Sequence, residues 1–343
     1  MRNLLASPLQ ERYRLVHFEA GSRGKESPAK DENILAKVLR ILTSPFALAW
    51  CIVRLRVSVV HLNSALDHKA FWRDLVYLLV CKMLGRKVVF QLHGGWLGDL
   101  CTNRWMRWIT RAAFSIPDAI VLLATVEIRE FAEIGITARV TVIANGVDVS
   151  KYCKSGREHS GNAQRFIYLG RLIRAKGIFE VIEAVETLRA EGREVELRIA
   201  GSGPAREEIE RYIHEHRLDG SVKLVGTVYG DSKIEFLRGA DLLMFPTYHR
   251  EGLPYCILES MAAGTPVVAT GVAGIPDVLI DGVHGVLVKP RDAGDVVRAV
   301  RQLSSSKAAL RAMSRNCIDW AKARLGLERL ARDFGDLYEK LSA

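Results

Sequence analysis

Short runs of apolar, β-branched residues alternate with longer stretches of helical periodicity along almost the whole chain. Runs of roughly four to eight such residues between turn signals are typical of buried parallel strands. In the first half, the predicted strands are residues 14–18, 57–63, 87–93, 119–124 and 140–144. In the second half, they are residues 165–170, 195–201, 222–226, 242–246, 265–270 and 285–289. The pattern therefore predicts an α/β protein built on parallel sheets.

The alternation is interrupted once, by the polar, basic segment KYCKSGREHSGNAQ at residues 151–164, which we interpret as a linker. At about 150 residues per domain, 343 residues also favour two domains. We predict two Rossmann-like parallel-sheet domains facing a cleft, with the ligand outside the carboxyl ends of their strands. The expected boundaries are 1–155, 156–315 and, for a terminal helical segment that packs back on the first domain, 316–343.

Composition excludes several classes of protein. With 49% apolar and 26% charged residues, the chain is neither disordered nor fibrous. The longest apolar runs fall far short of the roughly 20 residues of a spanning helix, and the first residues lack a secretory signal, so we expect a cytoplasmic protein. The cysteines are scattered singly, and neither an Asp-x-Asp motif nor a P-loop is present, so no catalytic metal is predicted.

The net charge of +10 is concentrated in the first half, where residues 1–150 hold 20 basic and 13 acidic side chains. Such charge fits an anionic partner, whether nucleic acid, membrane lipid or a phosphorylated substrate, but also an ordinary soluble surface. Residues 103–114, NRWMRWITRAAF, interleave tryptophan with arginine. This pattern is typical of a helix at an anionic membrane, and equally of a helix that buries tryptophan beneath arginine stems.

The stretch EGLPYCILE follows a predicted strand and leads into a predicted helix, with Pro254 in its first turn. Glu251 and Glu259 can bond sugar hydroxyls there, while the backbone N–H groups of Gly252 and Leu253 at the helix start can hold a phosphate. These residues are typical of a site for a sugar nucleotide. The alternative is that the two carboxylates merely cap and solvate the helix.

Two further loops follow strands of the second half. Arg171 and Lys176 leave the strand through Gly170, and two cations in such a loop suit a diphosphate, although an ordinary basic loop is the alternative. Gly201 and Gly203 allow backbone to approach a ligand closely. Their G-x-G pattern alone is weak, because the full dinucleotide motif is absent.

In the first half, His93 ends a predicted strand and is followed by Gly94 and Gly95. At that position its imidazole can act on an acceptor hydroxyl or orient the donor. A purely structural histidine is the alternative.

Taken together, these segments resemble glycosyltransferase family 4, retaining enzymes of the two-domain GT-B fold. The matching motifs, all in order, are N-G-V-D (145–148), G-R-L-I-R-A-K-G (170–177), A-G-S-G-P (200–204), E-G-L-P-Y-C-I-L-E (251–259) and G-I-P-D-V (274–278). The resemblance implies transfer of a hexose-type sugar from a nucleotide-diphosphate donor, with no cofactor or metal. It further implies an acceptor-side first domain and a donor-binding second domain.

The same resemblance assigns roles to residues. It implies that Arg171 and Lys176 hold the donor diphosphate, that Glu251 meets the donor sugar, and that Glu259 meets the ribose. His93 matches the family's histidine near the reacting sugar. The other expected donor-binding residues are Gly94, Gly95, Gly201, Gly203, Val228 near the base, Gly252 and Leu253. Because no clear nucleophile is present, we favour same-face attack, with the leaving diphosphate taking the proton of the incoming hydroxyl.

One departure from the family concerns the start of the chain, which reads as the end of the helix after the usual first strand and glycine-rich loop. We expect that first unit to be missing, through a misassigned or truncated start or through loss of part of the acceptor site. The predicted function is sugar transfer to a glycan or polyprenyl-linked acceptor in cell-surface polysaccharide synthesis. The predicted location is the cytoplasm, with the cytoplasmic face of a membrane as the alternative. The alternative is an inactive sugar-nucleotide-binding protein.

Three other classes of protein compete with this interpretation. A GT-B epimerase and a GT-B phosphorylase are enzyme alternatives. Nucleic-acid binding explains the charge but none of the strand-end motifs, and no helix-turn-helix, zinc-finger or RNP-like motif is present.

Overall fold

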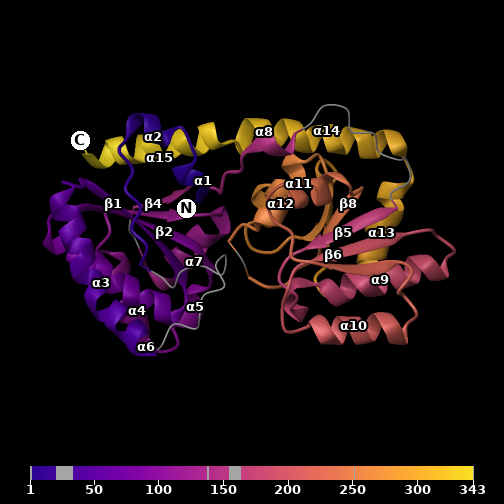
Figure 1. Ribbon diagram of the computed structural model, residues 1–343, viewed down its shortest axis with the longest axis horizontal. Coiled ribbons are helices and arrows are strands. Elements are labelled where there is room, and N and C mark those ends of the chain that lie inside the picture. Colours follow the sequence, from indigo (N-terminus) through magenta and orange to yellow (C-terminus); the bar gives the residue numbers. More distant parts are fainter. Residues whose placement is uncertain (1, 21–33, 137–138, 154–163, 251, 343) are drawn as a thin grey trace. The chain divides into compact units, whose positions relative to one another are not determined.

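The computed structural model describes residues 2–20, 34–136, 139–153, 164–250 and 252–342. The chain divides into unit 1, Met1–Ile143 with Ala331–Ala343, and unit 2, Ala144–Leu330. Each unit is built around one parallel sheet with helices against it (Figure 1). The predicted α/β fold with two parallel-sheet domains is therefore confirmed.

The sheet of unit 1 has the order β1-β2-β3-β4. Its strands are β1 (Val59–Leu66), β2 (Lys87–Gly95), β3 (Ala119–Leu122) and β4 (Val140–Val142). All pairs are parallel, with Val60 opposite Val88 and Phe90 opposite Ile120. The prediction of a strand at residues 14–18 is wrong: these residues are irregular, since an apolar run becomes a strand only beside a partner and this run pairs with no described strand.

Seven helices of unit 1 are α1 (Arg2–Leu5), α2 (Leu9–Arg12), α3 (Ile34–Arg54), α4 (His68–Met83), α5 (Leu97–Leu100), α6 (Arg104–Phe114) and α7 (Thr125–Ile134), as far as the chain is described. Side-chain caps begin two of them: Asp67 accepts from the Ala70 N–H at 2.9 Å, and Asn103 accepts from the Met106 N–H at 2.9 Å. Gly135, with φ of 83°, ends α7 in the left-handed conformation.

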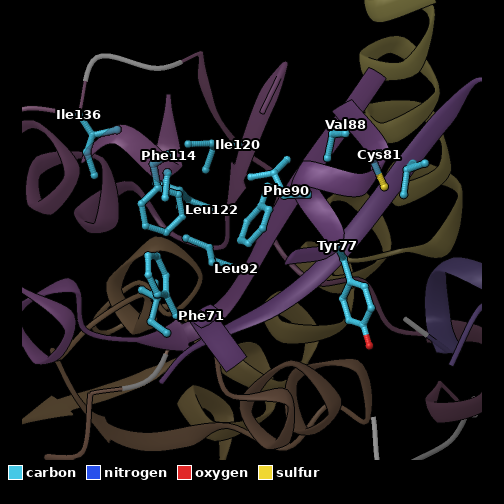
Figure 2. Packing of buried hydrophobic residues seen from close by; sticks show 14 of the residues in the cluster. Phe71, Tyr77, Cys81, Val88, Phe90, Leu92, Phe114, Ile120, Leu122 and Ile136 are labelled. Carbon is cyan, nitrogen blue, oxygen red and sulfur yellow. The ribbon is translucent and has the colours of Figure 1, made fainter. Parts of the chain in front are cut away.

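The core of unit 1 follows from alternation along the strands. Val88, Phe90 and Leu92 of β2 point into a cluster with Phe71 of α4 and Phe114 of α6 (Figure 2). The Phe114 ring centroid lies 5.8 Å from that of Phe90 and 6.1 Å from that of Phe71. The helices α4 and α6 therefore share one face of this sheet.

The opposite face of the same sheet carries polar side chains and the C-terminal helix α15 (Leu327–Ser342). The His61 ring of β1 lies 5.0 Å from that of Phe334, and its Nδ1 lies 2.6 Å from the Tyr338 hydroxyl. Arg12 of α2 is ion-paired with Glu339. The last residues of the chain are thus anchored on unit 1.

The sheet of unit 2 has the order β10-β9-β8-β5-β6-β7. Its strands are β5 (Arg165–Leu169), β6 (Glu196–Ala200), β7 (Val222–Gly226), β8 (Leu242–Phe245), β9 (Val267–Thr270) and β10 (Gly285–Val288). The chain moves outward from β5 through β6 to β7, then crosses back to β8 on the other side of β5. This reversal makes the boundary between β5 and β8 the topological switch point, where ligands bind in open parallel sheets.

The helices described in unit 2 are α8 (Val149–Tyr152), η1 (Arg174–Lys176), α9 (Ile178–Ala190), α10 (Arg206–Glu215), α11 (Gly230–Arg238), α12 (Tyr255–Ala262), η2 (Ile275–Asp277), α13 (Ala293–Ser304) and α14 (Lys307–Arg324). The predicted terminal helical segment falls in α14 and α15, with a break at residues 325–326. The predicted linker is wrong at its start, because residues 151–152 end helix α8, and its residues 154–163 lie outside the described residues. No helix in the described ranges is both long and apolar enough to cross a membrane.

Candidate functional site

A pocket of about 260 Å³ opens at the switch point of unit 2. Strands β5 and β8 end at it, and helices α11 and α12 contribute further side chains. Its lining residues are Leu169, Gly170, Lys176, Lys233, Phe245, Pro254, Tyr255, Cys256 and Glu259. The pocket thus combines residues from the two loops that the motifs single out with residues that no motif marks.

The loops after β5 and β8 are locked together by backbone contacts. The N–H groups of Tyr248 and His249 both donate to the Ala175 carbonyl at 2.9 Å. Gly177 has φ of 76°, and a Cβ there would lie 2.3 Å from the Pro246 carbonyl oxygen, so only glycine fits. This packing holds the intervening Lys176 with Nζ 5.5 Å from the centre of the Phe245 ring.

Gly201 and Gly203 bring the loop after β6 against the loop after β5. A Cβ on Gly201 would lie 1.8 Å from the Gly170 carbonyl oxygen, and one on Gly203 would lie 2.2 Å from that of Leu172. The Leu172 N–H donates to the Ser202 carbonyl at 3.0 Å. These glycines therefore allow the loop after β6 to pack closely against Gly170 at the pocket wall. Their direct contact with the donor stays a prediction.

Glu259 is the buried acid of the pocket, with 9% of the residue exposed. Its Oε1 lies 2.6 Å from Lys233 Nζ and accepts a hydrogen bond from the Tyr152 hydroxyl at 3.0 Å. Burial and the Glu259 charge raise the pKa of Tyr255 to about 12 and also raise the pKa of Tyr152. Both phenols are neutral at pH 7, so Tyr152 donates its proton to Glu259 and Tyr255 can donate to a ligand.

Helix α12 begins at Tyr255, directly after Pro254, and no side chain caps it. The Ile257 N–H donates to the Pro254 carbonyl at 3.2 Å, and the helix dipole makes this helix start favourable for a negative charge. The preceding turn is fixed because the Gly252 carbonyl accepts from the Gly274 N–H at 3.0 Å and the Leu253 carbonyl accepts from Asn145 at 3.4 Å. Gly252 and Leu253 are buried, whereas Glu251 lies outside the described residues.

Two other predicted site residues of unit 2, Arg171 and Val228, are not among the residues that line the pocket. Arg171 is exposed and is not among the pocket residues. Val228 is half-buried in the short loop between β7 and α11, five residues before Lys233.

The predicted residues of the first half lie in unit 1, at the carboxyl end of β2. His93 Nε2 lies 2.7 Å from Asn63 Oδ1, and burial lowers the His93 pKa to about 4, so the imidazole is neutral at pH 7. With Nε2 donating to Asn63, Nδ1 is left as the acceptor nitrogen. Gly94 and Gly95 have φ of 75° and 102°, and a Cβ on Gly95 would lie 2.5 Å from that of Leu66.

The structure adds residues that sequence reasoning missed. Lys233, Tyr255 and Cys256 line the pocket, and Tyr152 bonds to Glu259 from α8. Tyr255 and Cys256 lie inside the quoted motif, so their position after Pro254 was a usable signal. The sequence gives no signal for Lys233 and Tyr152, because only the packing of α8 and α11 beside α12 brings these side chains to Glu259.

Chemically, the pocket presents two ammonium groups, one carboxylate, two neutral phenols nearby and an uncapped helix start. The cations and the helix start suit a phosphate group, whereas the carboxylate and phenols suit hydroxyl groups. This combination fits a polar ligand that carries both, such as a ribose diphosphate.

Comparison with known proteins identifies the family to which the chain is similar. Residues 154–320 match the family described as Glycosyl transferases group 1, and residues 7–151 match Glycosyltransferase Family 4. Mycobacterium tuberculosis glycogen synthase is 29% identical over 71% of this chain and 56% of its own length. The amylovoran biosynthesis glycosyltransferase of Erwinia amylovora is 29% identical over 50% of this chain and 43% of its own. The chain therefore spans about half the length of these curated relatives.

Solved structures show the same architecture. Anabaena HepE in complex with UDP-glucose superposes with a TM-score of 0.74 at 18% identity, covering 90% of this chain and 84% of that one. Because the two family matches together reach across both units, and the parallel-sheet architecture is the same, the chain belongs to glycosyltransferase family 4 and has its GT-B fold.

Proposed function

We propose that the chain is a retaining glycosyltransferase that moves a hexose-type sugar from a nucleotide-diphosphate donor to a glycan or lipid-linked acceptor. The observation that carries this proposal is the pocket at the switch point of unit 2, where Lys176, Lys233 and Glu259 converge beside the start of α12. Charge, hydrogen-bonding groups and position in the sheet all agree with a nucleoside diphosphate as occupant.

In this proposal, Lys176 and Lys233 neutralise the charge that grows on the departing diphosphate, with the exposed Arg171 adding a further cation. Glu259 and Glu251 accept hydrogen bonds from hydroxyls of the ribose and the donor sugar. Neutral His93 orients a reacting hydroxyl through Nδ1. The acceptor then attacks from the face that the diphosphate leaves, its proton passes to a diphosphate oxygen, and the anomeric configuration is retained without a metal.

The proposed acceptor is a glycan or polyprenyl-linked saccharide of cell-surface polysaccharide synthesis. The Erwinia amylovora relative, by its name, serves amylovoran biosynthesis, which supports this class. Peripheral contact with an anionic membrane belongs to the same proposal. Trp105 and Trp108 are 78% and 65% exposed, which supports this contact over the alternative that α6 buries its tryptophans in an ordinary core.

The test is turnover. The purified protein is incubated with UDP-, GDP- and ADP-hexoses and a panel of glycan acceptors, and release of nucleoside diphosphate and of product is followed together. We expect acceptor-dependent release, and proton NMR of the product should show the anomeric configuration of the donor. Donor binding without acceptor-dependent release would favour the inactive sugar-nucleotide-binding alternative, and an inverted product would contradict retention.

A further inference from the structure

Helix α3 has two apolar faces on opposite sides. Ser44, Leu48 and Ile52 are buried against unit 1. At 100° per residue, the opposite side carries a stripe within an arc of about 80°. We name it the α3 outer stripe, and its residues are Leu39, Leu42, Phe46, Trp50 and Val53, all exposed. Phe46 is 77% exposed and Trp50 is 62% exposed. In a surface helix of a globular protein, the side opposite the core normally carries polar and charged residues.

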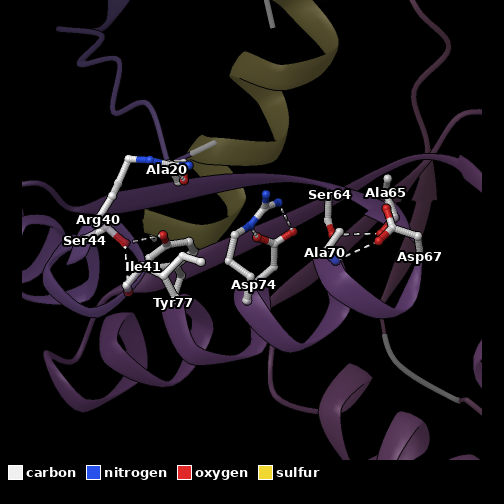
Figure 3. A network of polar contacts seen from close by, with 11 residues as sticks. Ala20, Arg40, Ile41, Ser44, Ser64, Ala65, Asp67, Ala70, Asp74 and Tyr77 are labelled. Carbon is white, nitrogen blue, oxygen red and sulfur yellow. Dashed lines mark hydrogen bonds and ion pairs between the residues drawn. The ribbon is translucent and has the colours of Figure 1, made fainter. Parts of the chain in front are cut away.

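Contacts on the buried side fix this orientation. Pro45 has no N–H to give to the Ile41 carbonyl, which accepts instead from the Ser44 hydroxyl at 3.4 Å. The Ser44 hydroxyl also lies 2.7 Å from that of Tyr77 on α4 (Figure 3). Because this buried link pins α3 to α4, rotation of the stripe toward the core would break it.

A second exposed apolar stripe runs along α4, which packs beside α3. It consists of Trp72, Val76, Leu79 and Met83, spaced at i, i+4, i+7 and i+11. Helix α6, on the same face of the sheet, adds the exposed Trp105 and Trp108. The helical layer of unit 1 therefore presents large apolar side chains from three helices, far more than scattered surface residues provide.

Basic residues accompany these side chains. Residues 34–114, which contain the three helices, hold 12 basic and 3 acidic residues, a net +9 of the total +10. Two of the acids are engaged locally, Asp67 as the cap of α4 and Asp74 in an ion pair with Arg73 at 2.6 Å. The Arg54 guanidinium lies 4.8 Å from the centre of the Trp50 ring, so aromatic and cation are presented together.

Two other occupants fit this face poorly. Residues 21–33, GSRGKESPAKDEN, contain no large apolar side chain with which to cover the stripe. A second copy of the same face would bring a net +9 against +9, and like charges at an interface oppose association. A surface of aliphatic and aromatic side chains among Arg and Lys matches the interface of an anionic lipid bilayer.

We propose that the α3 outer stripe and the exposed apolar stripe of α4 together form a docking surface for an anionic bilayer, with Phe46 and Trp50 as its principal anchors. This inference extends the membrane contact of the proposed function to a surface that the Trp-Arg helix alone did not reveal. The apolar side chains enter the boundary between headgroups and acyl chains, while the basic residues bind lipid phosphates.

Flotation with vesicles tests the proposal. Wild type, Phe46→Asp/Trp50→Asp and the matched control Ile280→Asp/Val283→Asp are mixed with phosphatidylcholine vesicles that contain or lack phosphatidylglycerol. The control pair also replaces two exposed apolar residues by Asp, but in unit 2. We expect wild type and control to float only with anionic vesicles, less so at high salt, and the α3 variant to lose at least tenfold in bound fraction.

Equal flotation of the α3 variant and wild type would overturn the proposal, as would failure of wild type to bind. A wild-type dimer in sedimentation that the α3 variant abolishes, without vesicle binding, would instead identify the stripe as a contact between copies. Thermal stabilisation by nucleoside diphosphate, measured on the same preparations, reports the donor pocket alone. Failure of wild type to float, with stabilisation by nucleoside diphosphate intact, therefore counts against this surface and leaves the donor pocket of the proposed function standing.

Discussion

Lys233 Nζ lies 2.6 Å from Glu259 Oε1, and the Tyr152 hydroxyl bonds to the same carboxylate oxygen. Three helices, α8, α11 and α12, each supply one of these side chains. A ligand hydroxyl that enters the pocket therefore meets a carboxylate already held in place by a cation and a phenol, which reduces the ordering that binding requires.

Replacing Lys233 by Met should destabilise unit 2 by about 2 kcal/mol, because Glu259 is then left mostly buried without its cation. Adding Glu259→Gln should recover much of that loss, since the uncompensated charge disappears. Urea unfolding of the single and double variants measures both effects. If Lys233→Met were as stable as the exposed control Lys223→Met, the Lys233–Glu259 ion pair would contribute nothing to the free energy of unfolding.

Cys256 lines the pocket, so a bound nucleotide should protect it from alkylation. We expect the rate of iodoacetamide labelling at Cys256, followed by mass spectrometry of peptides, to fall severalfold when nucleoside diphosphate is present. Cys101, also half-buried but in unit 1, is the internal control and should label at an unchanged rate. Equal rates at Cys256 with and without nucleotide would place the ligand elsewhere.

Gly201→Ala should destabilise the protein by about 3 kcal/mol or more, because its Cβ would overlap the Gly170 carbonyl and its φ of 150° is strained for alanine. Gly220→Ala is the matched control, since a Cβ there meets nothing within 4 Å, and should stay within about 0.5 kcal/mol of wild type. Denaturant midpoints compare the two. Similar midpoints would refute the packing role assigned to Gly201.

Acid should weaken unit 1 through its buried histidines. Burial lowers the pKa of His61 to about 3 and that of His93 to about 4, so the unfolded chain binds more protons than the folded one below pH 6.5. Stability is fully present above that pH and falls by about 1.4 kcal/mol per pH unit for each histidine as pH drops toward its folded pKa.

His61→Gln should reduce that slope, whereas the exposed control His17→Gln should leave it unchanged. Tryptophan fluorescence during urea unfolding from pH 7 to pH 4.5 provides the readout, because five of the six tryptophans lie in the first 150 residues. A slope in His61→Gln equal to that of wild type would show that this imidazole does not titrate on unfolding.

The strands were largely predictable because buried parallel strands such as Ala119–Leu122 and Leu242–Phe245 are short, wholly apolar runs. The same signal failed at residues 14–18, where strand formation depends on a partner that the run itself cannot specify. Lys176 and Glu259 were both marked by motifs, and the fold brings them into one pocket. Lys233 and Tyr152 became visible only through packing between helices far apart in sequence.

The outer stripe of α3 shows another limit. Its apolar residues repeat at helical spacing, but so do those of the buried side, and the sequence does not say which side faces the core. The Ser44–Tyr77 contact decides this, and it depends on α4. Sequence reasoning assigned the membrane contact to α6 because alternating Trp and Arg are conspicuous there.

The most direct test of the central claim is calorimetric binding of UDP, GDP and ADP to wild type, Lys176→Ala and the control Lys223→Ala. Lys223 lies on β7 and is ion-paired with Glu196 at 3.3 Å, outside the pocket. We predict binding of one nucleotide, weakened at least tenfold by Lys176→Ala and unchanged by Lys223→Ala. Equal affinity in Lys176→Ala and wild type, or no binding of any nucleoside diphosphate, would contradict the assignment of the unit 2 pocket as the donor site.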